Sequence, residues 1–274
     1  MSVKKQELRG AFCPSQSGNI FLKGYIMKQE SKKQRAQTVI PAKSKGESMV
    51  SDEERGIREV EEMLLLQLSK AKSQQEIESS MWKLISFYSR TRRQEIAFNY
   101  VNQLVERIDD PGKAAECYLA MGQLMEQIHD YKAAIEFYEQ AALLGPNTKP
   151  VAYLINNNMG YCLNYVGRYQ EAETYCKKAV AIDPERQNAY KNLGISLEGQ
   201  GHIGGAAQCY IRAIQANAND PRALDHLENL IENNREIVSA INDIHEQLED
   251  CRNAVKEAYE RKKKHYEDNN KCSA

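Results

Sequence analysis

Apolar and small residues in the middle of the chain follow a helical spacing that is broken at regular intervals. Within residues 153–186, the spacing of Met159, Gly160 and the apolar positions after them predicts a first helix, and Gly167 predicts a turn. A second run with the same spacing follows and ends at Pro184, because proline cannot continue a helix. The segment is therefore predicted to form a pair of antiparallel helices.

The same pattern occurs three times at a nearly fixed period. A shift of 34 residues places Gly160 on Gly194 and Gly167 on Gly201. Similarity at a fixed period is typical of stacked repeats. Between the first two copies the glycine spacing is 38 residues, and we expect the extra residues, around Asn147–Pro150, to lengthen a loop. The three predicted helix pairs cover residues 115–148, 153–186 and 187–220.

Each predicted first helix contains a glycine near its middle, namely Gly122, Gly160 or Gly194. A glycine inside a helix costs about 1 kcal/mol relative to alanine. Close packing of the second helix against the glycine backbone can offset that cost. We therefore predict that an alanine or aromatic side chain of the second helix lies against each glycine, and that large residues such as Tyr138 and Tyr210 fill the gaps between units.

The order of residue types in these units resembles the tetratricopeptide repeat: an aromatic residue, Leu-Gly or Met-Gly, two spaced alanines and a final proline. Residues 115–148 and 153–186 match most of this pattern, whereas Ala218 replaces the final proline in residues 187–220. The resemblance implies an all-α fold, a right-handed α-solenoid of stacked antiparallel helix pairs. It also implies a non-catalytic adaptor or scaffold that binds a peptide or a helix of a partner protein in its concave groove.

The segments on either side of the three units predict further helices. Residues 51–111 are expected to form an N-terminal helix and a degenerate repeat. Residues 221–268 are expected to form a degenerate capping repeat whose second helix runs on from about Arg235 to Tyr266. Both tails, residues 1–50 and 269–274, are expected to be disordered.

The apolar residues of the C-terminal segment also fit a heptad pattern, with Asn234 at a core position. A capping helix is the preferred interpretation, and a coiled-coil homodimer is the alternative. The basic tail adds to this alternative, since residues 1–50 contain ten Lys or Arg and three Glu, a net charge of +7. The second functional hypothesis is therefore a structural assembly subunit whose C-terminal helix self-associates and whose tail contacts an anionic surface or partner, with a nucleic acid or a membrane disfavoured.

The composition offers little support for catalysis. The chain has 274 residues, a net charge of −1 and 42% hydrophobic residues, and it contains no apolar run of membrane-spanning length. Its seven cysteines are dispersed, which favours a reducing cytoplasmic location over disulfides or a metal site. The sequence Gly199–Gly204 spells GxGxxG, but it follows a helix rather than a strand, which disfavours nucleotide binding. Neither enzyme activity nor a cofactor is expected.

In tetratricopeptide-repeat proteins, the first helix of each unit lines the groove that holds the partner. By position, the resemblance implies nine groove residues in this chain. Asn158 and Asn192 are equivalent residues one unit apart, and each amide can both donate and accept a hydrogen bond. Tyrosines add apolar contact with a polar tip. The predicted groove residues are Gln123, Asn157, Asn158, Tyr161, Asn164, Tyr165, Asn188, Lys191 and Asn192.

One subtype of the family, the heat-shock co-chaperones, holds a C-terminal carboxylate with Lys and Asn side chains and one Arg. Of the five positions in the three clear units, only Asn158 matches that clamp. Leu119 and Gln123 replace the first Lys and Asn, and Asn188 and Asn192 replace the last Lys and Arg. A carboxylate clamp of this type is therefore not expected.

Overall fold

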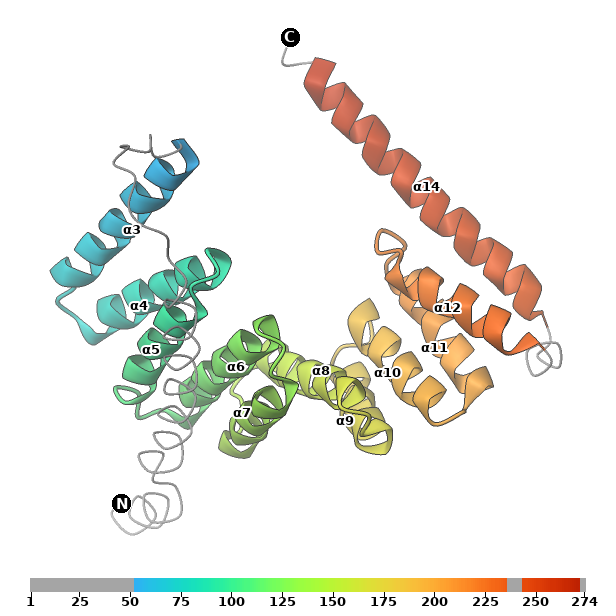
Figure 1. Cartoon of the computed structure of the whole chain (residues 1–274), viewed down its shortest axis with the longest axis horizontal. Helices are drawn as coiled ribbons and strands as arrows, with labels where there is room; N and C mark the ends of the chain where they lie inside the picture. The colour runs from blue at the N-terminus through green and yellow to red at the C-terminus, as the bar shows by residue number, and fades with distance from the viewer. Residues whose placement is uncertain (1–51, 236–242, 272–274) are drawn as a thin grey trace, which may run out of the picture. The chain divides into compact units, whose positions relative to one another are not determined.

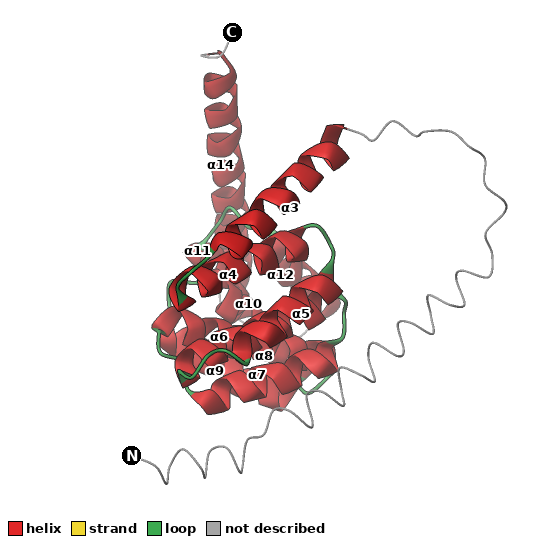
Figure 2. Cartoon of the chain, turned by 90° about the vertical axis from the view of Figure 1, so that its left-hand side faces the viewer, coloured by secondary structure: helices red, strands yellow, loops and turns green. Residues whose placement is uncertain are grey.

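The computed structural model describes residues 52–235 and 243–271, and every regular element within these ranges is a helix (Figure 1, Figure 2). The chain divides into two units, Met1–Glu54 and Arg55–Ala274, and all of the predicted repeats belong to the second. The expectation for residues 1–50 lies outside the described residues. The prediction of an all-α solenoid of stacked antiparallel helix pairs is confirmed.

From α4 onward the helices alternate between first and second members of a pair. Each helix from α4 to α12 packs against the next one along the chain, and the first helices α6, α8 and α10 also contact one another in order. The helices are α3 Asp52–Lys70, α4 Gln74–Arg90, α5 Gln94–Val105, α6 Pro111–Gln127, α7 Tyr131–Leu144, α8 Lys149–Tyr165, α9 Tyr169–Ile182, α10 Gln187–Gly199, α11 Ile203–Ala216, α12 Arg222–Asn233 and α14 Ile244–Lys271.

The mid-helix glycines allow close packing inside each pair, as predicted. A Cβ atom placed on Gly194 would lie 2.5 Å from the ring of Tyr210, and Gly122 stands in the same relation to Tyr138. The contacting residue of the second helix is thus an aromatic, with Cys176 taking that place opposite Gly160. Tyr138 and Tyr210 fill space within a pair as well as between units, because the Tyr210 ring also stacks on His226 of α12 and the Tyr138 hydroxyl accepts a hydrogen bond from Asn158 of α8.

The extra residues around Asn147–Pro150 do not lengthen a loop. They add a helical turn to the start of α8, which has 17 residues where α10 has 13. Thr148 caps this turn by accepting a hydrogen bond from the backbone of Val151, and Pro150 lies in the first turn, where its missing N–H costs nothing. The loop prediction failed because capping residues and proline favour a helix start as well as a turn.

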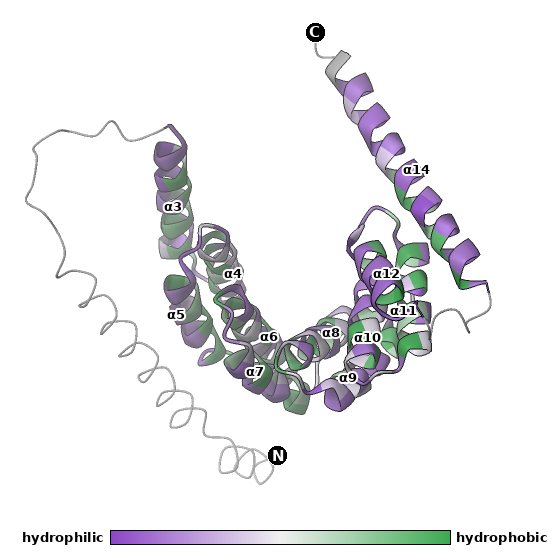
Figure 3. Cartoon of the chain, turned by 45° about the vertical axis from the view of Figure 1, so that its right-hand side comes forward, coloured by the Kyte–Doolittle hydropathy of each residue, from purple (hydrophilic) through white to green (hydrophobic). Residues whose placement is uncertain are grey.

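The C-terminal helix begins later than predicted. Asp243 has a φ of 60°, a left-handed conformation that cannot lie inside a helix, and α14 starts at the next residue and continues to Lys271. The first part of α14 packs against α11 and α12 through Ile244, Leu248 and Cys251, which belong to one buried cluster with α11 and α12. The rest of α14 is mostly hydrophilic (Figure 3). None of the described helices is long and apolar enough to cross a membrane.

Candidate partner-binding face

The asparagines of the predicted groove form a buried hydrogen-bonded seam between α8 and α10. The side-chain amide of Asn192 donates to the side-chain oxygen of Asn157 at 3.1 Å, and the amide of Asn164 donates to the backbone oxygen of Asn192 at 2.8 Å. Ser196, which is fully buried, donates to Asn164 at 2.9 Å. The side-chain oxygen of Asn192 is the exception, since it is buried without a hydrogen-bond partner among the described residues. The hydrogen bonds of the seam fix the spacing and register of two neighbouring first helices.

The seam continues across a third unit toward α6. The amide of Asn157 donates to Asn158, the amide of Asn158 donates to the hydroxyl of Tyr138, and that hydroxyl donates to the carboxylate of Glu126. Burial raises the pKa of Glu126 against the opposing effect of its hydrogen bonds to Tyr138 and Cys162. One chain of hydrogen bonds therefore connects α6, α8 and α10, with Tyr138 of α7 as the link between α8 and α6.

Three tyrosines gather beside this seam. The rings of Tyr131 and Tyr165 are stacked with centroids 4.2 Å apart, and the ring of Tyr161 meets Tyr165 edge-on at 4.8 Å. The side chain of Tyr165 is 59% exposed although it belongs to this cluster. Burial raises the pKa of both Tyr161 and Tyr131, so the phenols stay neutral hydrogen-bonding groups. The cluster, which we call the tyrosine cluster, offers exposed aromatic surface with polar tips.

The tyrosine cluster has no counterpart at the next junction between units. There the ring of Tyr169 packs over Gly199, and a Cβ at Gly199 would lie 2.5 Å from that ring. Gly201 has a φ of 77° and makes the turn into α11. Two of the glycines of the GxGxxG sequence thus have packing and turn roles in a helix–turn–helix segment.

A pair of cations lies on the same face. Lys191 is only 8% exposed, and burial together with the charge of Arg222 lowers its pKa, while Asp220 opposes this effect. Arg222 holds Asp220 by an ion pair with N···O at 2.5 Å, which lowers the pKa of Asp220 to about 2. The phenol of Tyr161 lies near enough to Arg222 to contribute to the raised pKa of that guanidinium. The cations and the tyrosine cluster are therefore neighbours.

The structure divides the nine predicted groove residues into two groups. Asn157, Asn164 and Asn192 lie inside the seam, with exposed fractions of 8% or less. The six others differ in exposure: Gln123, Asn158, Tyr161 and Asn188 are half-buried, Tyr165 is exposed, and Lys191 is as buried as Asn164, at 8%, with the charge of Arg222 acting on it.

Sequence reasoning missed Tyr131, Ser196 and Arg222. Tyr131 is an aromatic residue at the first position of a second helix, a place that the expected groove positions do not include. Arg222 opens the degenerate unit, where the match to the repeat was weakest, although the sequence Asp220-Pro221-Arg222 is a recognisable helix start. Within the described residues no cluster of His, Cys, Asp or Glu could hold a metal ion. Burial raises the pKa of the Cys117 and Cys176 thiols to about 12, so these cysteines behave as apolar residues.

Comparison with known proteins identifies the repeat. Family models described as tetratricopeptide repeats match residues 115–148 and 154–186. One curated relative, small glutamine-rich tetratricopeptide repeat-containing protein 2 of Mycosarcoma maydis, is 30% identical over 112 residues, which is 41% of this chain and 31% of the relative. The chain thus spans less than a third of the length of that relative.

Solved structures share the fold at lower sequence identity. MamA from Desulfovibrio magneticus RS-1, residues 41 to the end, superposes with a TM-score of 0.51 at 16% identity, over 68% of this chain and 96% of that chain. PilF of Pseudomonas aeruginosa superposes with a TM-score of 0.51 at 22% identity, over 66% of this chain and 78% of that chain. At this level of identity the similarity concerns the arrangement of helices.

Proposed function

We propose that this chain, a member of the tetratricopeptide-repeat family, is a non-catalytic adaptor that holds a segment of a partner protein on the face formed by α6, α8 and α10. The observation that carries the proposal is the tyrosine cluster, whose Tyr165 is 59% exposed although it stacks on Tyr131. Rigid exposed aromatic side chains bind partners at a low entropy cost and are enriched at binding hot spots.

The groove residues have separate tasks in this proposal. Tyr161, Tyr165 and Lys191 contact the partner directly, and Gln123, Asn158 and Asn188 supply hydrogen bonds at the edges. The buried residues Asn157, Asn164 and Asn192 hold α8 and α10 at a fixed spacing, so that the contacting side chains are already in place before binding. Preorganisation of this kind lowers the cost of binding.

The proposed partner segment carries an apolar side chain against the tyrosine cluster and an acceptor or anionic group near Lys191. A buried ammonium is costly without a counter-charge, and Asp220, the carboxylate whose charge acts on it, is already held by Arg222. The side chain of Asn192, which stands where a carboxylate clamp would need an arginine, is used within the seam. Clamping of heat-shock C-termini in the way of the co-chaperones is therefore not part of the proposal.

We place the adaptor in the cytoplasm. Five cysteines of the described residues are free thiols, and four of these are buried, an arrangement that suits a reducing compartment. A location test with a fused fluorescent reporter is straightforward, and exclusion of the reporter from the cytoplasm would contradict this part of the proposal.

The test is photo-crosslinking in the native cell. Tyr165 is replaced by p-benzoylphenylalanine in one full-length chain, and Tyr259 in another. Tyr259 lies on α14 and is 67% exposed, so the two positions have similar access to solvent but lie on different surfaces. We expect a discrete crosslinked partner from position 165 and none of the same mass from position 259. Identical crosslinking from both positions, or none from position 165, would refute binding at the tyrosine cluster.

A further inference from the structure

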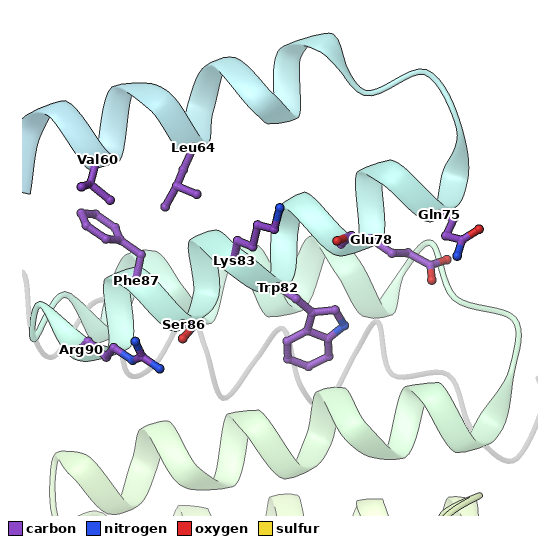
Figure 4. A pocket seen from close by; sticks show the side chains of 10 residues that line it. Val60, Leu64, Gln75, Glu78, Trp82, Lys83, Ser86, Phe87 and Arg90 are labelled. Atoms are coloured by element: carbon purple, nitrogen blue, oxygen red, sulfur yellow. The ribbon is translucent and has the colours of Figure 1, made fainter.

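A second candidate site lies at the N-terminal end of the repeats, away from the tyrosine cluster. A pocket of about 750 Å³ opens between α3 and α4 (Figure 4). Its apolar walls are Val60 and Leu64 of α3 and Trp82 and Phe87 of α4. The volume lies within the range of pockets that bind small ligands or anchoring side chains of peptides. We call it the Trp82 pocket.

Helix α3, which forms one wall of the Trp82 pocket, has more apolar residues than it buries against its neighbours. Leu64 is buried, but Val60, Met63 and Leu66 are 41%, 50% and 51% exposed. In a stacked array every helix is expected to bury its apolar residues against a neighbour. The exposed residues of α3 are therefore available to a further apolar element that would enter beside Val60.

The charges that line the Trp82 pocket favour an acidic occupant. Glu78 forms an ion pair with Lys113 at 2.8 Å, and this partner lowers the pKa of Glu78. Lys83 reaches only the amide oxygen of Gln67, at 3.4 Å, and Arg90 has no ion pair with any described residue. The lining has two cations and one carboxylate, a net charge of +1, and because Lys113 from outside the lining pairs with that carboxylate, Lys83 and Arg90 are left without a carboxylate of their own among the described residues.

We propose that the Trp82 pocket is a docking site for a segment of a partner protein that combines a bulky apolar side chain with flanking Asp or Glu residues. The apolar side chain packs against Val60, Leu64 and Phe87, while the Trp82 ring lies on the side of α4 that faces away from α3 (Figure 4), and the flanking carboxylates pair with Lys83 and Arg90.

The charge of the pocket favours an acidic segment of another protein over a competitor within this chain, the apolar stretch in its own N-terminal tail. Residues 1–50 contain an apolar stretch at residues 20–27, but their net charge of +7 has the same sign as the unpaired cations of the pocket. An acidic segment gains attraction at Lys83 and Arg90 where the basic tail gains repulsion. The proposal therefore assigns the pocket to another protein.

The pocket contains its own reporter, since Trp82 is the single tryptophan of the chain. The probe is a synthetic peptide with a Leu-Phe pair flanked by glutamates, and the matched control replaces each glutamate with lysine. Titration of the full-length chain with the acidic peptide should shift the Trp82 emission in a saturable way, and the lysine peptide should not. Absence of a saturable shift, or an equal shift with both peptides, overturns the proposal.

Charge-reversal variants locate the interaction. Lys83→Glu and Arg90→Glu should each weaken the acidic peptide by about fivefold, the effect of losing one partly exposed ion pair. Arg261→Glu on α14, which is far along the chain and exposed, is the control and should leave the affinity unchanged. If Lys83→Glu and Arg90→Glu bind the acidic peptide as tightly as the wild type does, with unchanged melting temperatures, the peptide binds elsewhere.

Two further variants separate the remaining outcomes. Tyr161→Ala should leave the peptide affinity at the Trp82 pocket unchanged, so that failure of the tyrosine-cluster proposal does not affect this one. Phe21→Ser/Leu22→Ser in the full-length chain tests the competitor, and it should leave the Trp82 emission of the free protein unaltered. A red shift of that emission together with tighter peptide binding would show that the chain's own N-terminal stretch fills the pocket, and would overturn the proposal.

Discussion

The side-chain amide of Asn192 donates to the side-chain oxygen of Asn157 across the junction of two repeats, with 3.1 Å between the nitrogen and the oxygen. Both side chains are buried, with exposed fractions of 3% and 7%. A buried amide pair of this kind is stabilising only while both partners are present, because an orphaned polar group loses its water without replacement. The contact therefore makes the fold sensitive to either asparagine.

Asn192→Ala should lower the free energy of unfolding by about 1–3 kcal/mol, the cost of leaving a buried polar group without its partner. Urea unfolding followed by circular dichroism measures this difference. Asn188→Ala is the control on the same helix, since Asn188 is only half-buried, and it should change stability by less than about 0.5 kcal/mol. A loss of similar size in both variants would show that the buried hydrogen bonds of Asn192 contribute no more to the free energy of unfolding than the half-buried Asn188 does.

Gly194→Leu should lower the free energy of unfolding by about 1–3 kcal/mol or more, because the added side chain would have to displace the fully buried ring of Tyr210. Gly56→Ala is the informative counterpart. Gly56 also lies within a helix, but nothing stands within 4 Å of a Cβ placed there, so alanine should stabilise by about 0.5–1 kcal/mol. Thermal unfolding of the two variants should thus move in opposite directions, and an unchanged melting temperature for Gly194→Leu would contradict the packing described above.

The glycine contacts could be predicted from the sequence because they depend on helical spacing within one unit. A glycine tolerated inside a helix at a fixed period points to close packing, and the contacting residue lies sixteen positions later on the second helix in all three units. The repeat pattern and the solenoid followed from this local regularity. The contacting residue was harder to predict, because an alanine and an aromatic of the second helix were both within reach of Gly194.

The predicted groove residues lie on α6, α8 and α10, but the sequence alone could not assign their roles. Whether Asn157 faces a partner or the next repeat depends on the distance between α8 and α10, which no residue within α8 determines. The start of α14 was missed for a similar reason, since the left-handed backbone at Asp243 leaves no trace in the heptad pattern around it. The sequence therefore predicts contacts between units less well than contacts within a unit.

Glu126 should give the fold a pH dependence of unusual sign. Burial raises its pKa in the folded state above the ordinary value of 4.5, so the stability that it contributes is present below that value and is lost as the pH rises through the raised pKa. Glu126→Gln keeps an acceptor for Tyr138 without the charge. The variant should therefore gain stability relative to the wild type as the pH is raised from 4.5 to 7, as measured by urea unfolding.

A control with the opposite sign is available in Glu171. Its hydrogen bond to Arg168 lowers its pKa, so its carboxylate is the favoured form in the folded state. Glu171→Gln should therefore lose stability relative to the wild type as the pH rises. Parallel pH dependence of the two variants would show that burial does not dominate at Glu126.

The C-terminal helix should not make the protein a dimer. The hypothesis of a coiled-coil homodimer needs a continuous apolar seam, but Ile244, Leu248 and Cys251 are buried against α11 and α12 of the same chain. Val255 packs against the same buried cluster, and Ala258 is only 2% exposed. The heptad positions of α14 are therefore already covered within the chain, which leaves too little apolar surface for a stable pair of helices.

Light scattering at micromolar concentration should accordingly give the mass of one chain, 31.2 kDa. Leu248→Asp separates the two interpretations of the apolar residues. If they hold α14 onto α11 and α12, the variant lowers the melting temperature and leaves the mass unchanged, because the residue is 6% exposed and its neighbours are within the chain. A dimeric mass for the wild type that falls to the monomer in Leu248→Asp, with an unchanged melting temperature, would instead support the assembly-subunit hypothesis.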